Sequence, residues 1–226
     1  MKRYALGLLT LLFGTSEVLS APLQSQVKDR TEHHLESVIA LRHWFHANPE
    51  LGNREFNTAA RIARELKGLG LDEVKVGIAH TGVVGILRGG LPGPTVALRA
   101  DMDALPVTEK TGLPFASTVT TLWGGIETGV MHACGHDAHM AILLGVARVL
   151  SDMRAEIPGT VMFVFQPAEE GPPLDEEGGA ELMLKEGLFS GPDRPGAVFG
   201  LHVFPGPTGS IRYRPNGFMA ASDYLE

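Results

Sequence analysis

The spacing of apolar residues along the chain predicts helices that alternate with short strands. Residues 31–46 and 56–69 place apolar side chains every three or four positions, as on one face of an amphipathic helix. Residues 160–165 form an unbroken apolar run, as expected of a strand buried on both faces. Further strands are predicted at 74–78, 83–87, 95–99 and 197–201 (the last again buried), and further helices at 138–153 (opened by Asp137) and 179–187. This order is typical of an α/β fold with a mixed, mostly parallel sheet and helices on both faces.

Carboxylates or an imidazole follow three of the predicted strands, at the point where each strand ends. These residues are Asp101, Asp103, Glu169, Glu170 and His202. Ligands of open α/β sheets bind beyond the carboxyl ends of the strands. We therefore expect these side chains to share one site.

Composition and charge narrow the class of protein. The chain has 226 residues, of which 44% are hydrophobic, 28 are glycine and 15 are proline. So many turn-forming residues disfavour a helical bundle. Lys and Arg number 19 against 26 Asp and Glu, a net charge of -7, with no basic stripe; this excludes a typical nucleic-acid-binding protein.

The first 21 residues have the layout of a secretory signal peptide. Lys2 and Arg3 precede an apolar run at 5–13, and small residues follow, with cleavage expected after Ser20. The alternative, an uncleaved membrane anchor, is disfavoured because the run is shorter than the roughly 20 residues that a span needs. We expect an exported protein, periplasmic or secreted. Its single cysteine, Cys134, excludes an internal disulfide.

A dense group of metal-ligand residue types lies at 132–139, with the sequence HACGHDAH. Cys134 and His136 are two residues apart across a glycine, and thiolate and imidazole are normal zinc ligands. Only some of this group can be ligands. Asp137 and His139 are expected to cap the following helix or to support a ligand.

The two acid pairs admit both functional and structural interpretations. One of Glu169 and Glu170 can bind a metal while the other acts as a general base; alternatively both belong to a solvated loop, since more acids follow. Either of Asp101 and Asp103 can orient a ligand or bridge metals, unless Arg99 simply neutralises the pair.

Several motifs together resemble one metallopeptidase family. The motifs are HANPEL (46–51), RADMDALP (99–106), MHACGHD (131–137), QPAEEG (166–171) and GLHV (200–203). From about residue 41 to the last residue the chain is similar to the amidohydrolase branch of the aminoacylase/carboxypeptidase family. That branch includes hippurate hydrolases, N-acyl-amino-acid amidohydrolases and plant auxin-conjugate hydrolases.

The resemblance implies a site for two divalent metal ions, zinc by preference, with manganese, cobalt and nickel as alternatives. It implies Cys134, His136, Glu170 and His202 as ligands. Glu169 would be the general base and Asp103 an aspartate that orients a ligand. The implied reaction is hydrolysis of the amide bond of an N-acyl amino acid by a metal-activated water molecule. The implied partners are this substrate or a short peptide, with no nucleic acid and no stable membrane anchor.

One departure from the family pattern concerns the end of the sequence. The family places a further histidine ligand and a lid domain beyond the matching part. The resemblance implies that the full-length form pairs into a homo-oligomer through this lid. We expect residues 22–217 to be the N-terminal part of the catalytic domain and 218–226 the start of the inserted lid. Three other functions stay open: a carboxypeptidase or dipeptidase with the same site, an inactive metal-binding fragment, and a Cys–His thiol hydrolase.

Overall fold

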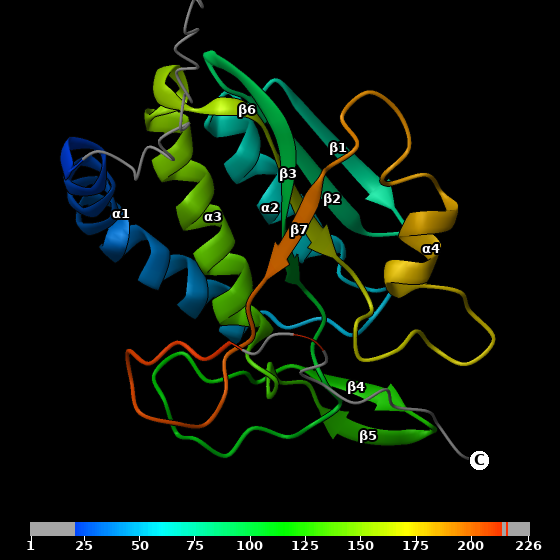
Figure 1. The fold of residues 1–226 in the computed structure, drawn as a ribbon. Helices are drawn as coiled ribbons and strands as arrows, with labels where there is room; N and C mark the ends of the chain where they lie inside the picture. The colour runs from blue at the N-terminus through cyan, green and yellow to red at the C-terminus, as the bar shows by residue number, and fades with distance from the viewer. Residues whose placement is uncertain (1–20, 214–215, 217–226) are drawn as a thin grey trace, which may run out of the picture.

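The computed structural model describes residues 21–213 and residue 216. Its central element is a five-stranded sheet in the order β1-β2-β6-β3-β7 (Figure 1). The strands of this sheet are β1 (Glu73–Ile78), β2 (Gly82–Arg88), β3 (Leu91–Asp101), β6 (Pro158–Gln166) and β7 (Ala197–Gly200). The other elements are helices α1 (Ala21–Ala47), α2 (Phe56–Gly68), α3 (His136–Asp152) and α4 (Gly179–Lys185), a short 3₁₀ helix (Arg154–Glu156), and a hairpin of β4 (Thr120–Trp123) and β5 (Ile126–Gly129).

The sheet is mixed, and four of its five strands run in one direction. β2 is antiparallel to both of its neighbours, β1 and β6, whereas β3 is parallel to β6 and to β7. The carboxyl ends of the parallel strands β6, β3 and β7 therefore lie side by side. This arrangement confirms the predicted sheet and brings the polar residues that follow these strands to one edge.

Alternation of side chains along β6 builds a core on each face of the sheet. Phe163 and Phe165 point into the larger core, which α2 and α3 cover and against which α1 packs. Met162 and Val164 point to the other face, where they pack with Met183 of α4. Helices therefore lie on both faces, as predicted (Figure 1). The central position of β6 explains its unbroken apolar sequence.

Strand β7 differs from its prediction as a buried strand. It lies at the edge of the sheet, pairs with β3 on one side, and has no strand on its other side among the described residues. Val198 and Phe199 are 51% and 58% exposed. The prediction of burial was wrong because an apolar run shows that a strand can be buried but does not show which neighbours cover it.

Two further elements departed from expectation. Helix α1 begins at Ala21, ten residues before the predicted start, because residues 23–30 are mostly exposed and carry no apolar face to mark the helix. The β4–β5 hairpin was not predicted. Its Gly124-Gly125 turn has φ of 57° and 79°, the positive values that a two-residue type I′ turn requires, so this dipeptide was the available signal.

Two domain predictions fall on parts of the chain that the structure does not describe. Apart from its last residue, the predicted leader (1–21) lies outside the described residues, and so does the predicted start of a lid (218–226). Both stay predictions. Within the described part of the chain, no helix combines the length and the apolar character needed to cross a membrane.

Candidate metal centre

The predicted site residues gather where the parallel strands end and helix α3 begins. Asp103 follows β3, the Glu169-Glu170 pair follows β6, and His202 follows β7. The thiol of Cys134 and the imidazole of His136, at the start of α3, face the same space. The ligand atoms of Cys134, His136 and Glu170 all lie within 4.8 Å of one another.

His136 presents one ring nitrogen to this space in the form that binds a metal. Its side chain is fully buried, and its Nδ1–H donates to the backbone carbonyl of Asp103 at 2.8 Å. A carbonyl can only accept, so Nδ1 carries a proton, and Nε2 is the ring nitrogen that is left to bind a metal once it has given up its own proton. Among the described residues Nε2 has no hydrogen-bond partner, although carboxylate oxygens of Asp101, Glu169 and Glu170 lie 3.6–3.8 Å away. A buried ring nitrogen that faces acids at these distances is suited to a cation between them.

His202 repeats this pattern from the opposite side. Its Nδ1–H donates to the carbonyl of Val203 at 2.7 Å, which leaves Nε2 as the free nitrogen. Nε2 lies 3.3 Å from the sulfur of Cys134. The Nε2 atom of His202 therefore faces a thiol and that of His136 faces carboxylates, and together these groups are a donor set that zinc and related divalent metals prefer.

The electrostatics of the cluster also favour a cation. Burial alone would lower the pKa of His136, but a contact of Nδ1 with the Asp103 carboxylate at 3.3 Å and the charges of Asp101, Asp103 and Glu169 outweigh burial and raise it to about 8. Burial and the charge of Asp101 raise the pKa of Glu169. The acids thus outnumber the positive charges around them, and the residues present fit a divalent metal ion.

The same surroundings argue against a thiol nucleophile. Burial, a hydrogen bond to Glu170 and the nearby charges of Glu169 and Asp101 raise the pKa of Cys134 to about 12. A catalytic thiol needs the opposite environment, one that lowers its pKa. The hypothesis that this site belongs to a Cys–His thiol hydrolase is therefore disfavoured.

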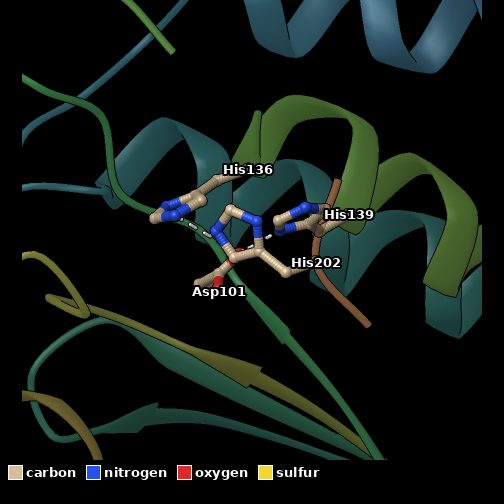
Figure 2. Close-up of side chains that lie close together, drawn as sticks. All are labelled: Asp101, His136, His139 and His202. Atoms are coloured by element: carbon tan, nitrogen blue, oxygen red, sulfur yellow. Dashed lines mark hydrogen bonds and ion pairs between the residues drawn. The ribbon is translucent and has the colours of Figure 1, made fainter. Parts of the chain in front are cut away.

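Asp101 and His139 form a second buried pair next to these ligands (Figure 2). A second set of possible metal ligands has its ligand atoms within 4.8 Å of one another and consists of Asp101, His136, His139 and His202. However, both ring nitrogens of His139 are already engaged: Nδ1–H donates to Asp101 at 2.6 Å, and Nε2 accepts the backbone N–H of Val203 at 2.9 Å. Asp101 is in turn paired with Arg99 at 2.7 Å. We therefore assign His139 to holding the segment that carries His202, rather than to binding metal.

We expect His139→Gln to weaken the affinity of the chain for Zn²⁺ about 10–100-fold, because outer partners of metal ligands have effects of this size. Calorimetric titration measures it. His34→Gln is the matched control, since His34 also pairs with an aspartate, Asp152, at 2.8 Å but lies far along the chain from the site. A loss as large as that of His136→Gln would instead make His139 a ligand, and wild-type affinity would remove it from the site.

Asp103 separates in role from Asp101. Its carboxylate Oδ2 accepts the backbone N–H of Glu170 at 2.9 Å, and its carbonyl holds His136. It therefore holds two of the candidate ligands by hydrogen bonds, and the role that the family resemblance implies for Asp103 stays a prediction. Arg99 pairs with Asp101, so charge neutralisation by Arg99 applies to Asp101. Orientation of candidate ligands applies to Asp103.

Asp137 does not cap helix α3, contrary to one prediction. The helix begins at His136, and the residue before it, Gly135, has φ of 89° and no side chain to cap with. A Cβ atom at Gly135 would lie 2.3 Å from a methyl carbon of Val203, so glycine permits the segment of His202 to approach. Asp137 instead accepts from His46 at 2.9 Å and from Arg42 at 3.2 Å.

Two buried residues near the site were not predicted as functional. His46 lies between two carboxylates, Asp137 at 2.9 Å and Glu109 at 3.1 Å, and the motif HANPEL was the only sequence signal for it. Glu55 is fully buried and contacts the loop of Glu169. Nothing in its sequence context distinguishes it from an exposed acid at the start of a helix.

Fold and cluster together define an α/β protein with a candidate metal site at the carboxyl ends of its parallel strands. Residues 97–216, just over half of the chain, match the peptidase family M20/M25/M40. The chain belongs to this family, which confirms the resemblance found in its motifs.

Individual relatives are similar over most of this chain. Thermostable carboxypeptidase 1 of Saccharolobus solfataricus is 45% identical over 188 residues, which cover 82% of this chain and 44% of that protein. An N-acetylcysteine deacetylase of Bacillus subtilis is 40% identical over 190 residues, covering 84% and 46%. The structure of the B. subtilis YXEP protein, a dinuclear metal binding peptidase from the M20 family, matches with a TM-score of 0.64 and 40% identity, covering 79% of this chain and 44% of that one. The chain spans about half the length of the curated relatives it matches.

Proposed function

We propose that this chain carries the metal site of an amidohydrolase that cleaves the amide bond of N-acyl amino acids. One observation carries the proposal: Cys134, His136 and Glu170 place ligand atoms within 4.8 Å of one another, with Nε2 of His202 3.3 Å from the thiol and a second carboxylate, Glu169, beside them. Such a set provides ligands and a separate base in one place. Divalent metal ions held by Cys134, His136, Glu170 and His202 would supply Lewis-acid activation of the water and of the scissile carbonyl.

Glu169 is the residue of this chain best placed to move the proton. Its Oε2 atom lies 3.8 Å from Nε2 of His136, and its side chain is 36% exposed, so it reaches both the ligands and solvent. Its raised pKa makes it a stronger base than an exposed glutamate. It takes a proton from the attacking water and returns it to the departing amine. Glu170 is turned to the ligand side, with its backbone held by Asp103.

The similarity to an N-acetylcysteine deacetylase supports an N-acyl amino acid as the substrate. The similarity to a carboxypeptidase supports the second candidate, removal of a C-terminal residue from a peptide at the same site. Both substrates present an amide next to a free carboxylate. The two candidates differ in whether the acyl side is a simple acid or a peptide.

A substrate and metal screen distinguishes these candidates. The chain, and its fusion to the remaining half of the YXEP protein, are loaded with Zn²⁺, Mn²⁺, Co²⁺ or Ni²⁺ and given benzoylglycine, N-acetylcysteine or an N-blocked dipeptide. We expect release of the free amino acid from the first two, loss of this activity with a chelator, and recovery on adding metal. Cleavage of the blocked dipeptide alone would replace the proposal with a carboxypeptidase. Hydrolysis that survives chelation, or none with any metal in either protein, would overturn it.

A further inference from the structure

The turn that carries both glutamates is held from two sides by carboxylates. We call residues 167–171, between β6 and the Pro-rich segment after it, the acid turn. The backbone N–H of Glu170 donates to Asp103 at 2.9 Å, as described above. The backbone N–H of Ala168 donates to Oε1 of Glu55 at 2.8 Å, across 113 positions of sequence. The two residues flanking Glu169 are therefore each fixed by a carboxylate from another part of the chain.

The complete burial of the Glu55 carboxyl group is energetically unfavourable. It has no exposed surface, and its only hydrogen-bonding side-chain neighbour among the described residues is Thr81, whose hydroxyl donates to Oε2 at 2.6 Å. Burial raises its pKa to about 7, against the lowering effect of these hydrogen bonds. Both of its oxygens are used, and one of them contacts the acid turn. Burial of a carboxyl group costs free energy unless its hydrogen bonds offset that cost.

The acid turn itself needs an external support. Ala168 has φ of 46°, a left-handed conformation that is unfavourable for a residue with a side chain, and it is 3% exposed. Such a conformation persists only where the surroundings impose it. The segment before α2 lies directly against the turn: a Cβ atom at Gly52 would be 2.8 Å from the carbonyl oxygen of Gly171. Glu55 supplies the hydrogen bond at this contact.

We propose that Glu55 is a positioning residue, which acts through Ala168 to aim Glu169 and Glu170 at the metal site. The inference rests on the proposed function for the roles of these two acids. Glu55 itself touches neither metal nor substrate. Its contribution is to keep the acid turn in the one conformation in which Glu170 reaches the ligands and Glu169 lies beside them.

The test compares substitutions of Glu55 in the chain itself by calorimetric titration with Zn²⁺ and with Mn²⁺. Glu55→Ala is expected to weaken metal affinity about 10-fold or more, the range of outer partners of a metal site. Glu55→Gln is expected to retain most of it, because the amide oxygen accepts from Ala168 and the Thr81 hydroxyl accepts from the amide. Glu65→Ala is the matched control, since Glu65 lies on helix α2, which Glu55 directly precedes, and Glu65 pairs with Arg61 and Arg148 away from the acid turn. It is expected to lower stability and leave metal affinity unchanged.

A purely structural role of Glu55 gives a different result. Glu55→Ala would then behave like Glu65→Ala, with reduced stability and wild-type metal affinity in the folded protein, and the proposal would be overturned. If Glu55→Ala does not fold, Glu55→Asp replaces it, because it keeps the charge but withdraws the carboxylate by one methylene from Ala168. Its metal affinity must fall for the proposal to stand. These titrations use no substrate, so an absence of amide hydrolysis would overturn the proposed function and leave this inference standing.

Discussion

Glu169→Gln is expected to lower the turnover of N-acyl amino acids by about 10²–10⁴-fold, the usual contribution of a general base, while metal binding is retained. An amide of the same size cannot accept the proton of the attacking water. Because Glu169 lies 3.8 Å from Nε2 of His136 and is one-third exposed, its replacement leaves the ligand atoms in place. Turnover is measured in the chain and in its fusion to the remaining half of YXEP, and metal content by elemental analysis.

Glu170→Gln should show the opposite pattern, with weakened metal binding as the primary defect. Its backbone is tied to Asp103, and its carboxylate lies 3.7 Å from Nε2 of His136. Glu177→Gln is the matched control, because Glu177 belongs to the acid-rich segment that follows and pairs with Lys185 on the surface. It should change neither property. If all three variants bind metal and turn over alike, Glu169 and Glu170 belong to a solvated loop and have no catalytic role.

The position of the site was predictable because the ends of the strands were. Strands buried on both faces are apolar without interruption, as in β6, so the first charged residues after such a run mark where the chain leaves the sheet. Glu169 follows β6 in this way. β3 is less regular, because Arg99 and Asp101 lie within the strand, and Asp103 follows its end. Once the strands are parallel, their ends meet at one edge, and no side-chain detail is needed to bring these residues together.

What the sequence could not indicate is burial that depends on distant contacts. Glu55 stands at the start of helix α2, where an acid is favoured by the helix dipole and is usually solvated. Its contact with Ala168 spans 113 positions, and the packing of Gly52 against the acid turn lies beside this contact. The sequence likewise could not indicate the exposure of β7. Its apolar residues are exposed because β7 is the outermost strand of the sheet.

The tautomers of the histidines were equally out of reach of the sequence. The motif HACGHDAH contains three histidines, and the sequence predicted a supporting role for His139 without showing which ring nitrogens separate ligands from supports. In the structure the separation follows from hydrogen bonds: His136 donates from Nδ1 and leaves Nε2 free, whereas His139 uses both nitrogens. Such roles depend on backbone carbonyls and amides that lie close only in the folded chain.

Cys134→Ser is expected to remove most of the bound metal and nearly all activity. The sulfur lies 3.3 Å from Nε2 of His202 and within 4.8 Å of the ligand atoms of His136 and Glu170. A hydroxyl is a harder and much less acidic donor than a thiol, and so it replaces a thiolate poorly. The loss of Zn²⁺ affinity should exceed the roughly 10–100-fold expected of an outer partner such as His139.

Because the chain has a single cysteine, the loss of the metal–sulfur bond can be measured by spectroscopy. Cys134 is the only cysteine of the chain, so a thiolate-to-cobalt absorption band of the Co²⁺-loaded protein can come only from this residue. The band should be absent in Cys134→Ser. Ala133→Ser is the matched control, since it adds the same hydroxyl at the neighbouring exposed position and leaves the sulfur in place. That variant should bind Co²⁺ and absorb as the wild type does. Full metal occupancy in Cys134→Ser, with unchanged affinity, would show that the thiol is not a ligand. The centre would then have to be built on His136, Glu170 and His202 without it.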